Sequence, residues 1–562
     1  MTRGASTRMR IVWAPIYVAV IAIGVTIGIR VVVRGYSPVP FSDLWAMFPF
    51  IERAVDGDIG LSDLWAQHNE HRLAVARLEF LVDYRYFEGR NIFLFASIVS
   101  TCLLLATVFA AAVWIETRDW LVALGTLAVA GAAALPLAGT ENLTLAVNVA
   151  FVQAFLFATV SILGVVLAAR TSIPSRRAIW SGVTAIAAIA ATYALANGLL
   201  AWFVVVALAL VLRLDRRNTA ALVAVGSVTA ATYLWHFEFT RGFDLSRPVD
   251  LAHYVLLFLG AAPTPTSSTA AVAGAVGLGL LVLLCRLAWV QRLETTILVP
   301  FGAGVAVLVA LTAAQTAGSR LELGVSQALS SRYSIASEVF WLGLFVGFLP
   351  ALQQRLRSVA WAIPAYLATV AVLALGLGYG ASPSADELRS LTVGRKATVL
   401  GYRVGVEDDT QSVPNVQLTW TPVTNGLRWL EREKLGPFVP GGIADDMRVT
   451  GPVTEPQRRC LGEFDPVEAV RGGVRLGGWI ASPTGEPSSQ NLVVLDTEGR
   501  RAGLGLVGFH RTNVERDDIP DASWTGFVAY VRGDPAGSLD VLLLGDDGKK
   551  GLCRLTHVNG SA

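Results

Sequence analysis

Long apolar runs dominate residues 1–380 of the chain, and no run of comparable length follows Tyr379. Most of these runs approach the roughly 20 residues that an α-helix needs to cross the hydrocarbon core of a bilayer. The pattern predicts about eleven crossings, at residues 11–29, 92–115, 120–137, 143–169, 178–196, 199–212, 220–235, 270–287, 297–317, 334–352 and 359–379. A shorter run at 251–260 is expected to lie in the membrane interface. We therefore expect an α-helical polytopic membrane protein.

The C-terminal end of the chain has a different pattern, in which short apolar stretches alternate with tight turns. The stretches are 478–480, 492–495, 503–508, 526–531 and 539–544, and Gly- and Asp-rich turns such as 496–499 and 545–548 separate them. Evenly spaced strands of this kind are typical of a small β-sandwich, and one helix is expected ahead of them at 425–434. We predict three parts: a transmembrane bundle at 1–380 with a large first outer loop at 35–90, an extracytoplasmic linker or helical region at 381–455, and a β-sandwich-like domain at 456–562.

Composition agrees with the membrane class. Hydrophobic residues make up 53% of the chain and charged residues 16%, which is more apolar than a typical soluble protein. The first apolar run has a basic flank but no small-residue cleavage site close behind it, which predicts a retained anchor rather than a removed signal peptide. We expect the lipid bilayer to be a partner and nucleic acid not to be one.

Arginines indicate the orientation of the bundle, because short loops rich in basic residues stay in the cytoplasm. With a cytoplasmic N-terminus, the short outer loops hold only Arg241, Arg247, Arg320 and Arg332. The inner side holds a larger set: Arg3, Arg8, Arg10, Arg118, Arg170, Arg176, Arg177, Arg213, Arg216, Arg217, Arg286, Arg292, Arg355 and Arg357. An odd number of crossings then exports the first loop and the C-terminal region. The expected location is the bacterial cytoplasmic (inner) membrane.

The four cysteines fall into two pairs. Cys102 and Cys285 lie inside apolar runs, where a thiol behaves as a small hydrophobe. Cys460 and Cys553 bracket the strand-rich region. Outside the cell they would form a disulfide worth roughly 4–5 kcal/mol in the chain-entropy model, and the alternative is two free thiols.

Asp43 is the first candidate catalytic residue. It lies in loop 35–90 shortly after the first crossing, and ionisable groups near hydrocarbon are costly unless they are paired or used. Ser42 and Asp43 also precede an apolar stretch that could be helical, so a helix cap is the plainer interpretation. The same five letters, Ser-Asp-Leu-Trp-Ala, recur at 62–66, and this repeat favours capping.

A second candidate group follows in the same loop. His68, His71 and Arg72 are spaced i, i+3 and i+4 and would share one face of a helix. The two histidines with Glu70 could bind a divalent metal, but the sequence shows no complete set of ligands. Anion binding by His68, His71 and Arg72 fits better, and a solvated or headgroup-facing surface is the third interpretation.

Two more loops predicted on the outer side carry polar residues suited to a phosphate. Glu141 and Asn142 follow the third crossing, and Arg320, Arg332 and Tyr333 lie between the ninth and tenth. A guanidinium offers a planar fork of donors to a phosphate. The competing interpretation for each arginine is that it reaches to lipid headgroups.

Several of these segments resemble known proteins. An acidic residue in the first large outer loop, an amphipathic juxtamembrane helix, about eleven crossings and an exported β-rich domain resemble the GT-C superfamily of membrane glycosyltransferases. The segments 68–72, 141–143, 196–200 and 331–333 are similar to parts of related bacterial multi-pass membrane proteins. The architectural resemblance covers most of the chain, while the motifs are short.

The resemblance implies transfer of a sugar from a polyprenyl-phosphate carrier to a glycan or lipid acceptor of the cell envelope. Asp43 would act as general base, with Glu70 as its rival because no adjacent acidic pair stands at Asp43. His68, His71, Arg72, Glu141, Asn142, Arg320, Arg332 and Tyr333 would bind the substrate and its phosphate. No cofactor is expected, although a divalent metal is not ruled out by the residues.

Two other classes of function remain open. A transporter or flippase of a lipid-linked substrate would need charged or broken segments near mid-membrane, and crossings such as 199–212 carry no charge. A non-catalytic, glycan-binding envelope protein would use aromatic residues of the C-terminal domain, namely Trp479, Trp524 or Tyr530.

The arginine pattern predicts that Met1 lies in the cytoplasm and Ala562 outside. Reporter fusions at the two termini should therefore report opposite compartments. Two reporters on the same side would mean that the number of crossings is even, and the C-terminal region would then not be exported.

Overall fold

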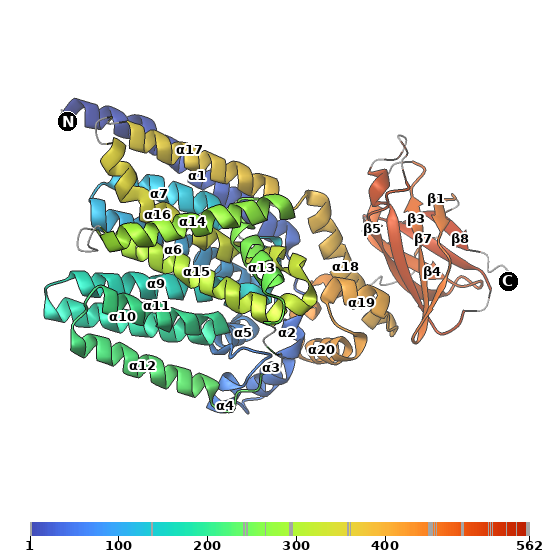
Figure 1. Ribbon diagram of the computed structural model, residues 1–562. Helices are drawn as coiled ribbons and strands as arrows, with labels where there is room; N and C mark the ends of the chain where they lie inside the picture. The colour runs from blue at the N-terminus through green and yellow to red at the C-terminus, as the bar shows by residue number, and fades with distance from the viewer. Residues whose placement is uncertain are drawn as a thin grey trace. The chain divides into compact units, whose positions relative to one another are not determined.

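The computed structural model describes residues 3–557 except 136–138, 240–241, 243–244, 265, 291–295, 357–358, 360, 448–452, 455, 457, 485–487, 515, 517–518, 520, 536 and 547. Figure 1 shows the order of the elements. Some residues on which predictions were made lie outside the described residues: Met1, Leu137, Arg241, Arg292, Arg357, Glu455, Asp547 and Ala562.

The chain packs as two units. The first comprises Met1–Val33, Gly60–Glu79 and Leu94–Ser382, and the second comprises Arg34–Ile59, Phe80–Phe93 and Pro383–Ala562. The predicted loop 35–90 is therefore divided, because its middle packs with the helical bundle while its two ends pack with the C-terminal region. The predicted boundary near residue 380 coincides with the end of the first unit.

The first unit is helical, and every predicted apolar run coincides with one of its helices. They are α1 (Arg3–Gly35), α4 (Leu61–Trp65), α6 (Ile92–Thr117), α7 (Trp120–Ala134), α8 (Thr140–Thr144), α9 (Val149–Arg170), α10 (Pro174–Ala194), α11 (Leu199–Val211), α12 (Arg216–Leu234), α13 (Pro248–Gly260), α14 (Ser267–Val290), α15 (Leu298–Arg320), α16 (Ser334–Leu356) and α17 (Ala362–Ala381), with short 3₁₀ turns η1 (Ala146–Asn148), η2 (Ala196–Gly198), η3 (Leu321–Leu323), η4 (Val325–Leu329) and η5 (Ser331–Tyr333).

Seven helices in the described part of the chain are long and apolar enough to cross a membrane: Ile11–Gly35, Ile92–Thr117, Ala146–Arg170, Ser267–Val290, Leu298–Leu323, Ser331–Leu356 and Ala362–Ala381. Helices α7 and α13 and the segment Ala196–Val211 are apolar but shorter. Several apolar helices thus support a membrane protein, while the larger predicted count of crossings is not established by helix length and composition. Helix α13 has the half-length that the sequence indicates.

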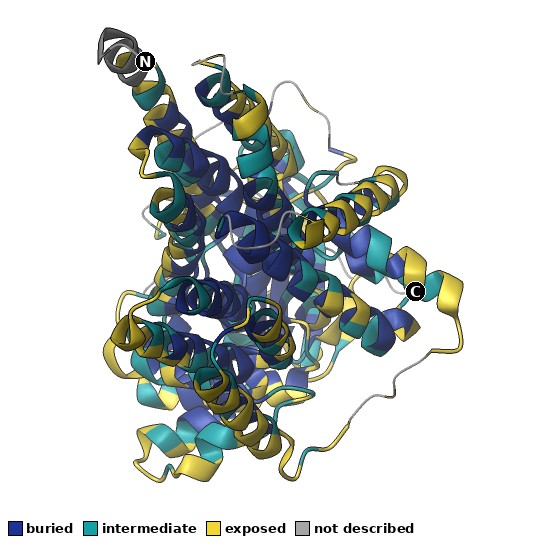
Figure 2. Cartoon of the chain, turned by 60° about the vertical axis from the view of Figure 1, so that its left-hand side comes forward, coloured by how far each residue is buried: buried dark blue, intermediate teal, exposed yellow. Residues whose placement is uncertain are grey.

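Burial separates central from peripheral helices in this unit. In the apolar stretch of the helix that contains α9, 83% of the residues are buried inside the protein. The corresponding share is only 28% in each of α1, α14 and α17. Figure 2 shows buried faces at the centre of the bundle and exposed faces at its margin. Helices α15 and α16 contact closely through glycines, since a Cβ on Gly302 would lie 2.3 Å from the carbonyl oxygen of Gly343. Small residues allow such close helix contacts in membranes.

The second unit begins with short helices around an aromatic cluster. Its helices are α2 (Asp43–Ala46), α3 (Phe48–Val55), the end of α5 (Ala74–Tyr86), α18 (Ala385–Val404), α19 (Asp409–Val416), α20 (Trp420–Glu433) and α21 (Ile443–Asp446), with the 3₁₀ turn η6 (Gly436–Phe438). The Phe48 ring contacts Trp45, Tyr84 and Trp429, with ring centroids 5.2–6.1 Å apart. The helix predicted at 425–434 is confirmed as part of α20, which begins earlier, at Trp420.

The C-terminal strands form one antiparallel sheet in the order β1-β3-β6-β5-β4-β7-β8, with β2 paired to β3. They are β1 (Leu461–Phe464), β2 (Glu468–Val470), β3 (Gly473–Ala481), β4 (Ser488–Leu495), β5 (Arg501–Phe509), β6 (Gly526–Arg532), β7 (Leu539–Gly545) and β8 (Gly551–His557), with the 3₁₀ turn η7 (Ala522–Trp524). The β-rich domain is confirmed, although its strands pair in a single sheet rather than in the two separate sheets of a sandwich. Helix α18 packs on β5 and β6.

A disulfide links the two edge strands of this order, β1 and β8. Cys460, just before β1, is bonded to Cys553 of β8, as the sequence predicts. The Cys460 N–H also donates to the carbonyl oxygen of Arg554 at 2.9 Å. Cys102 and Cys285 are free cysteines.

We predict that replacing Cys460 and Cys553 together by Ser lowers the stability of the second unit. The bond closes a separation of 93 residues, for which the chain-entropy model gives about 4–5 kcal/mol. Thermal unfolding of the purified variant should show the loss. The matched control Cys285→Ser should unfold like the wild type, and an unchanged unfolding temperature in the double variant would contradict the prediction.

Candidate functional site

The segment from His68 to His71 forms a tight hairpin rather than a helix. The His68 N–H donates to the His71 carbonyl oxygen at 2.8 Å, and the His71 N–H donates back at 2.9 Å. Asn69 adopts a positive φ of 49°, which interrupts helical geometry. The predicted helical face of His68, His71 and Arg72 is therefore wrong, and helix α5 begins only at Ala74.

Glu70, at the tip of this hairpin, is paired with Arg320 at the end of α15. Glu70 Oε2 lies 3.4 Å from Arg320 Nη2, and the two side chains are 20% and 25% exposed. Both residues line a cavity of about 150 Å³ in the first unit. The sequence separation of 250 residues shows that only the folded bundle brings the two charges together.

The same cavity gathers two more of the predicted residues and an aromatic wall. His71 and Tyr333 line it, together with polar and apolar residues that include Asn197, Gln315, Ser319, Phe151, Tyr233, Phe237 and Phe239. The Ala196 N–H lies 3.3 Å from His71 Nδ1. This contact makes Nδ1 an acceptor and leaves Nε2 to carry the proton of a neutral imidazole.

Arg72 has a structural position instead of lining this cavity. Its buried guanidinium donates to the carbonyl oxygens of Trp65 and Tyr233, each at 2.6 Å, and also to that of Trp235. The Tyr233 hydroxyl in turn donates to the Glu70 carbonyl oxygen at 3.1 Å. Arg72 therefore fixes the hairpin to the end of α12. His68 contacts the Asn69 side chain at 3.2 Å.

A second acid–arginine pair joins α8 to η5. Arg332 Nε lies 2.8 Å from Glu141 Oε2, and the buried Asn142 amide donates to the Arg332 carbonyl oxygen at 2.9 Å. Gly139 permits this approach, because a Cβ there would lie 2.0 Å from the Ser331 carbonyl oxygen. The structure thus brings together Glu141, Asn142 and Arg332, which the sequence marks separately as candidate substrate-binding residues.

The two pairs border one region of the bundle. Helix α13 packs against α15, which ends at Arg320, and against η4, which leads into η5 and Arg332. Tyr333 follows Arg332 directly and packs its ring against Phe258 of α13 at 5.2 Å. Helix α13 and η5 therefore connect the Arg320 and Arg332 environments.

Asp43 belongs to the second unit. It is the exposed first residue of α2, and the preceding N-cap residue Ser42 makes no side-chain capping bond. The acid of the repeated sequence at 62–66 occupies a different helix position from Asp43. Asp63 is the third residue of α4, and its carboxylate accepts a hydrogen bond from the Gly60 N–H at 2.9 Å. Capping is thus confirmed for Asp63, and the role of Asp43 as a general base stays a prediction.

Metal-ligand geometry is not found at this site. Among the described residues, no group of three His, Cys, Asp or Glu side chains could hold a metal ion. The aromatic residues suggested for glycan binding do not form an exposed surface on which a sugar could stack. Trp524 and Tyr530 are buried, and Trp479 is half-buried.

Two acids of the bundle were missed in the sequence, one half-buried (Glu79) and one buried (Glu338). Glu79 of α5 accepts hydrogen bonds from Ser97 of α6 at 2.8 Å and Gln153 of α9 at 2.6 Å. Glu338 of α16 is buried in a second cavity. A lone acid inside an apolar run was the available signal for Glu338, since such residues are rare in membrane helices.

No protein-family model matches this chain, and no curated protein matches its sequence. The interpretation of the site therefore rests on its residues and their geometry.

Burial raises the pKa of Glu79 above its ordinary value of about 4.3, although the bonds from Ser97 and Gln153 oppose the shift. A raised pKa means that the folded state loses stability as the pH rises from the unfolded pKa through the folded pKa. We therefore predict that Glu79→Gln unfolds a few degrees higher than the wild type at pH 7.5, and that the gap closes as the pH approaches 4.3. Thermal unfolding across this pH range measures it. The exposed control Glu322→Gln should show no such pH-dependent gap, and a Glu79→Gln gap that stays constant with pH would contradict the assignment.

Proposed function

We propose that this protein is a membrane glycosyltransferase that moves a sugar from a polyprenyl-phosphate carrier to an extracytoplasmic acceptor of the cell envelope. The observation that carries the proposal is the Glu70–Arg320 pair, which lines a cavity at one end of a bundle of apolar helices. A carboxylate and a guanidinium side by side supply the two groups that such a transfer needs. One group takes a proton, and the other stabilises a phosphate.

Glu70 is the proposed general base. Its carboxylate removes the proton from the acceptor hydroxyl as the acceptor oxygen bonds to the sugar, and the bond between the sugar and the carrier phosphate breaks. Glu70 is preferred to Asp43 because it lines a cavity and lies beside a cation. The Tyr233 and Arg72 bonds that fix the hairpin favour a constant position for this carboxylate.

Arg320 is the proposed phosphate ligand. Negative charge grows on the carrier phosphate as the sugar leaves, and a fixed guanidinium stabilises that charge. A bound phosphate would compete with Glu70 for Arg320 and so release the carboxylate for proton transfer. Arg332, held by Glu141, is a second candidate at the same end of the bundle.

The aromatic residues of the cavity suit a carbohydrate. Phe151, Tyr233 and Phe237 line it, and aromatic rings offer flat apolar faces on which a sugar ring can stack. Asn197, Gln315 and Ser319 add polar side chains for sugar hydroxyls. This combination of apolar faces with few polar groups is usual in small-molecule sites.

We predict that Glu70→Gln lowers kcat about 10²–10⁴-fold, because the amide keeps the shape but cannot take the proton. Arg320→Ala should instead raise the KM for the donor by roughly 10–100-fold, the equivalent of losing a charge-assisted hydrogen bond. The measurement is transfer from radiolabelled polyprenyl-phosphate hexose and pentose donors by the full chain in vesicles.

The exposed residue Glu322 supplies the matched control, and Glu322→Gln should transfer like the wild type. Full transfer by Glu70→Gln, together with loss in Asp43→Asn, would move the base to Asp43. If the wild type bound the donor but transferred no sugar, the proposed enzymatic activity would be wrong, and a transporter or a glycan-binding protein would be favoured.

A further inference from the structure

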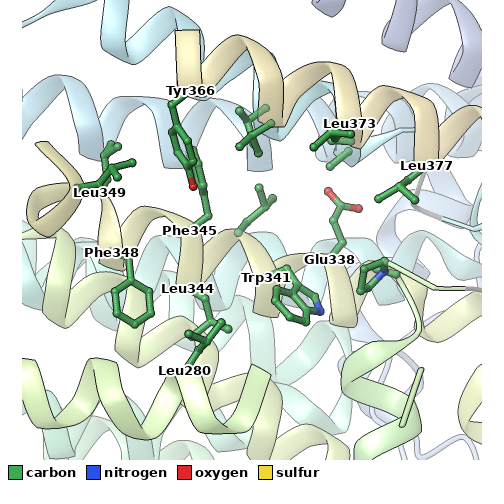
Figure 3. Close-up of a pocket in the computed structure, with 18 residues that line it drawn as sticks. Leu280, Glu338, Trp341, Leu344, Phe345, Phe348, Leu349, Tyr366, Leu373 and Leu377 are labelled. Atoms are coloured by element: carbon green, nitrogen blue, oxygen red, sulfur yellow. The ribbon is translucent and has the colours of Figure 1, made fainter. Parts of the chain in front are cut away.

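A second cavity of the first unit shares no lining residue with the one that holds Glu70. It has a volume of about 470 Å³ and is bounded by α7, α14, α16, α17 and the chain just after α13. Its lining on α16 extends from Glu338 to Leu352, which is about 21 Å along a helix that rises 1.5 Å per residue. Figure 3 shows the side chains around it. An elongated cavity with an almost wholly apolar lining suits an alkyl chain.

Glu338 is the one acidic side chain in this lining, and the other lining residues are aliphatic, aromatic or proline. It is 2% exposed, and neither of its carboxyl oxygens has a hydrogen-bond partner among the described residues. Figure 3 shows the carboxyl group directed toward Leu373 and Leu377 of α17. A buried acid without a partner is costly in an apolar bundle, so a partner that the chain itself does not provide is expected.

Two hydrogen-bond donors that flank Glu338 on α16 are already engaged elsewhere. The Ser337 hydroxyl and the Trp341 indole N–H both donate to the Leu259 carbonyl oxygen, at 2.7 and 3.0 Å. The donors on either side of Glu338 in α16 are thus already engaged with α13.

The end of α13 makes the same part of the cavity more electronegative. Ala262 and Pro263 follow the C-terminus of α13 and line the cavity, and the Ala262 N–H donates to the hydroxyl of Ser337, the residue next to Glu338. A helix C-terminus carries a partial negative charge. An anionic headgroup would therefore meet two unfavourable charges here, whereas a cation would meet two favourable ones.

We propose that this cavity binds a single-chain amphiphile whose polar end is an ammonium group. The ammonium contacts the Glu338 carboxylate and the electronegative end of α13, and the alkyl chain lies between α16 and α17. Ammonium supplies both the charge and the hydrogen-bond donors that the carboxyl oxygens lack. The site does not depend on the proposed sugar transfer, whose phosphate would be excluded from it by charge.

The test uses the full chain in lipid nanodiscs and two photoreactive probes of equal chain length, an alkylamine and an alkanol that each carry a diazirine near the chain end. The alkylamine should label peptides of α16 and α17, with unlabelled alkylamine competing at least roughly tenfold better than unlabelled alkanol. Glu338→Gln should reduce alkylamine labelling by a similar factor and leave alkanol labelling unchanged. Equal competition by the two compounds in the wild type would overturn the proposal, and this arm needs no variant to fold.

Two further variants separate the headgroup from the chain. Leu373→Trp fills the cavity opposite Glu338, so it should abolish specific labelling of α16 and α17 by both probes. Glu322→Gln removes an exposed acid and should label like the wild type. Alkylamine labelling that is equal in Glu338→Gln and the wild type would show that the carboxyl group does not select the ligand and would overturn the site.

Discussion

The guanidinium of Arg72 holds together the part of the first unit on which the candidate site depends. It donates to main-chain carbonyl oxygens on both sides of a long sequence gap, at Trp65 and at Tyr233. Carbonyl groups at helix ends need such donors when water is excluded. With the end of α12 fixed in this way, the Tyr233 hydroxyl reaches the Glu70 main chain. The carboxylate of Glu70 then lies within reach of Arg320, on a hairpin that its own short sequence would not hold in place.

Four acids of the bundle have three different kinds of surroundings. Glu70 and Glu141 each face an arginine and remain partly exposed. Glu79 is half-buried and accepts from two neutral donors, which is enough for a structural role. Within the described part of the chain, the carboxyl oxygens of Glu338 have no hydrogen-bond partner. The first class suits chemistry on a charged substrate, and the last calls for a ligand.

The sequence predicts the helices and strands better than it predicts how they meet. Apolar runs mark the long helices of the bundle because burial in lipid or protein requires them, and Cys460 and Cys553 could be paired because they bracket one set of strands. The Glu70–Arg320 contact joins residues 250 positions apart; sequence reasoning predicts that both belong to one site, but it does not predict their direct ion pair. The helix expected at 68–72 fails because two main-chain hydrogen bonds and the positive φ of Asn69 favour a hairpin. Loop 35–90 looked like one outer segment, yet its packing partners differ along its length, which local sequence does not reveal.

Helix α13 contributes to the surroundings of both cavities. Phe258 packs on Tyr333, which lines the cavity of Glu70. One residue further, the Leu259 carbonyl oxygen accepts the bonds from Ser337 and Trp341 that flank Glu338, and Trp341 lines the second cavity. Two adjacent residues of α13, about 1.5 Å apart along the helix axis, thus contact the linings of both cavities.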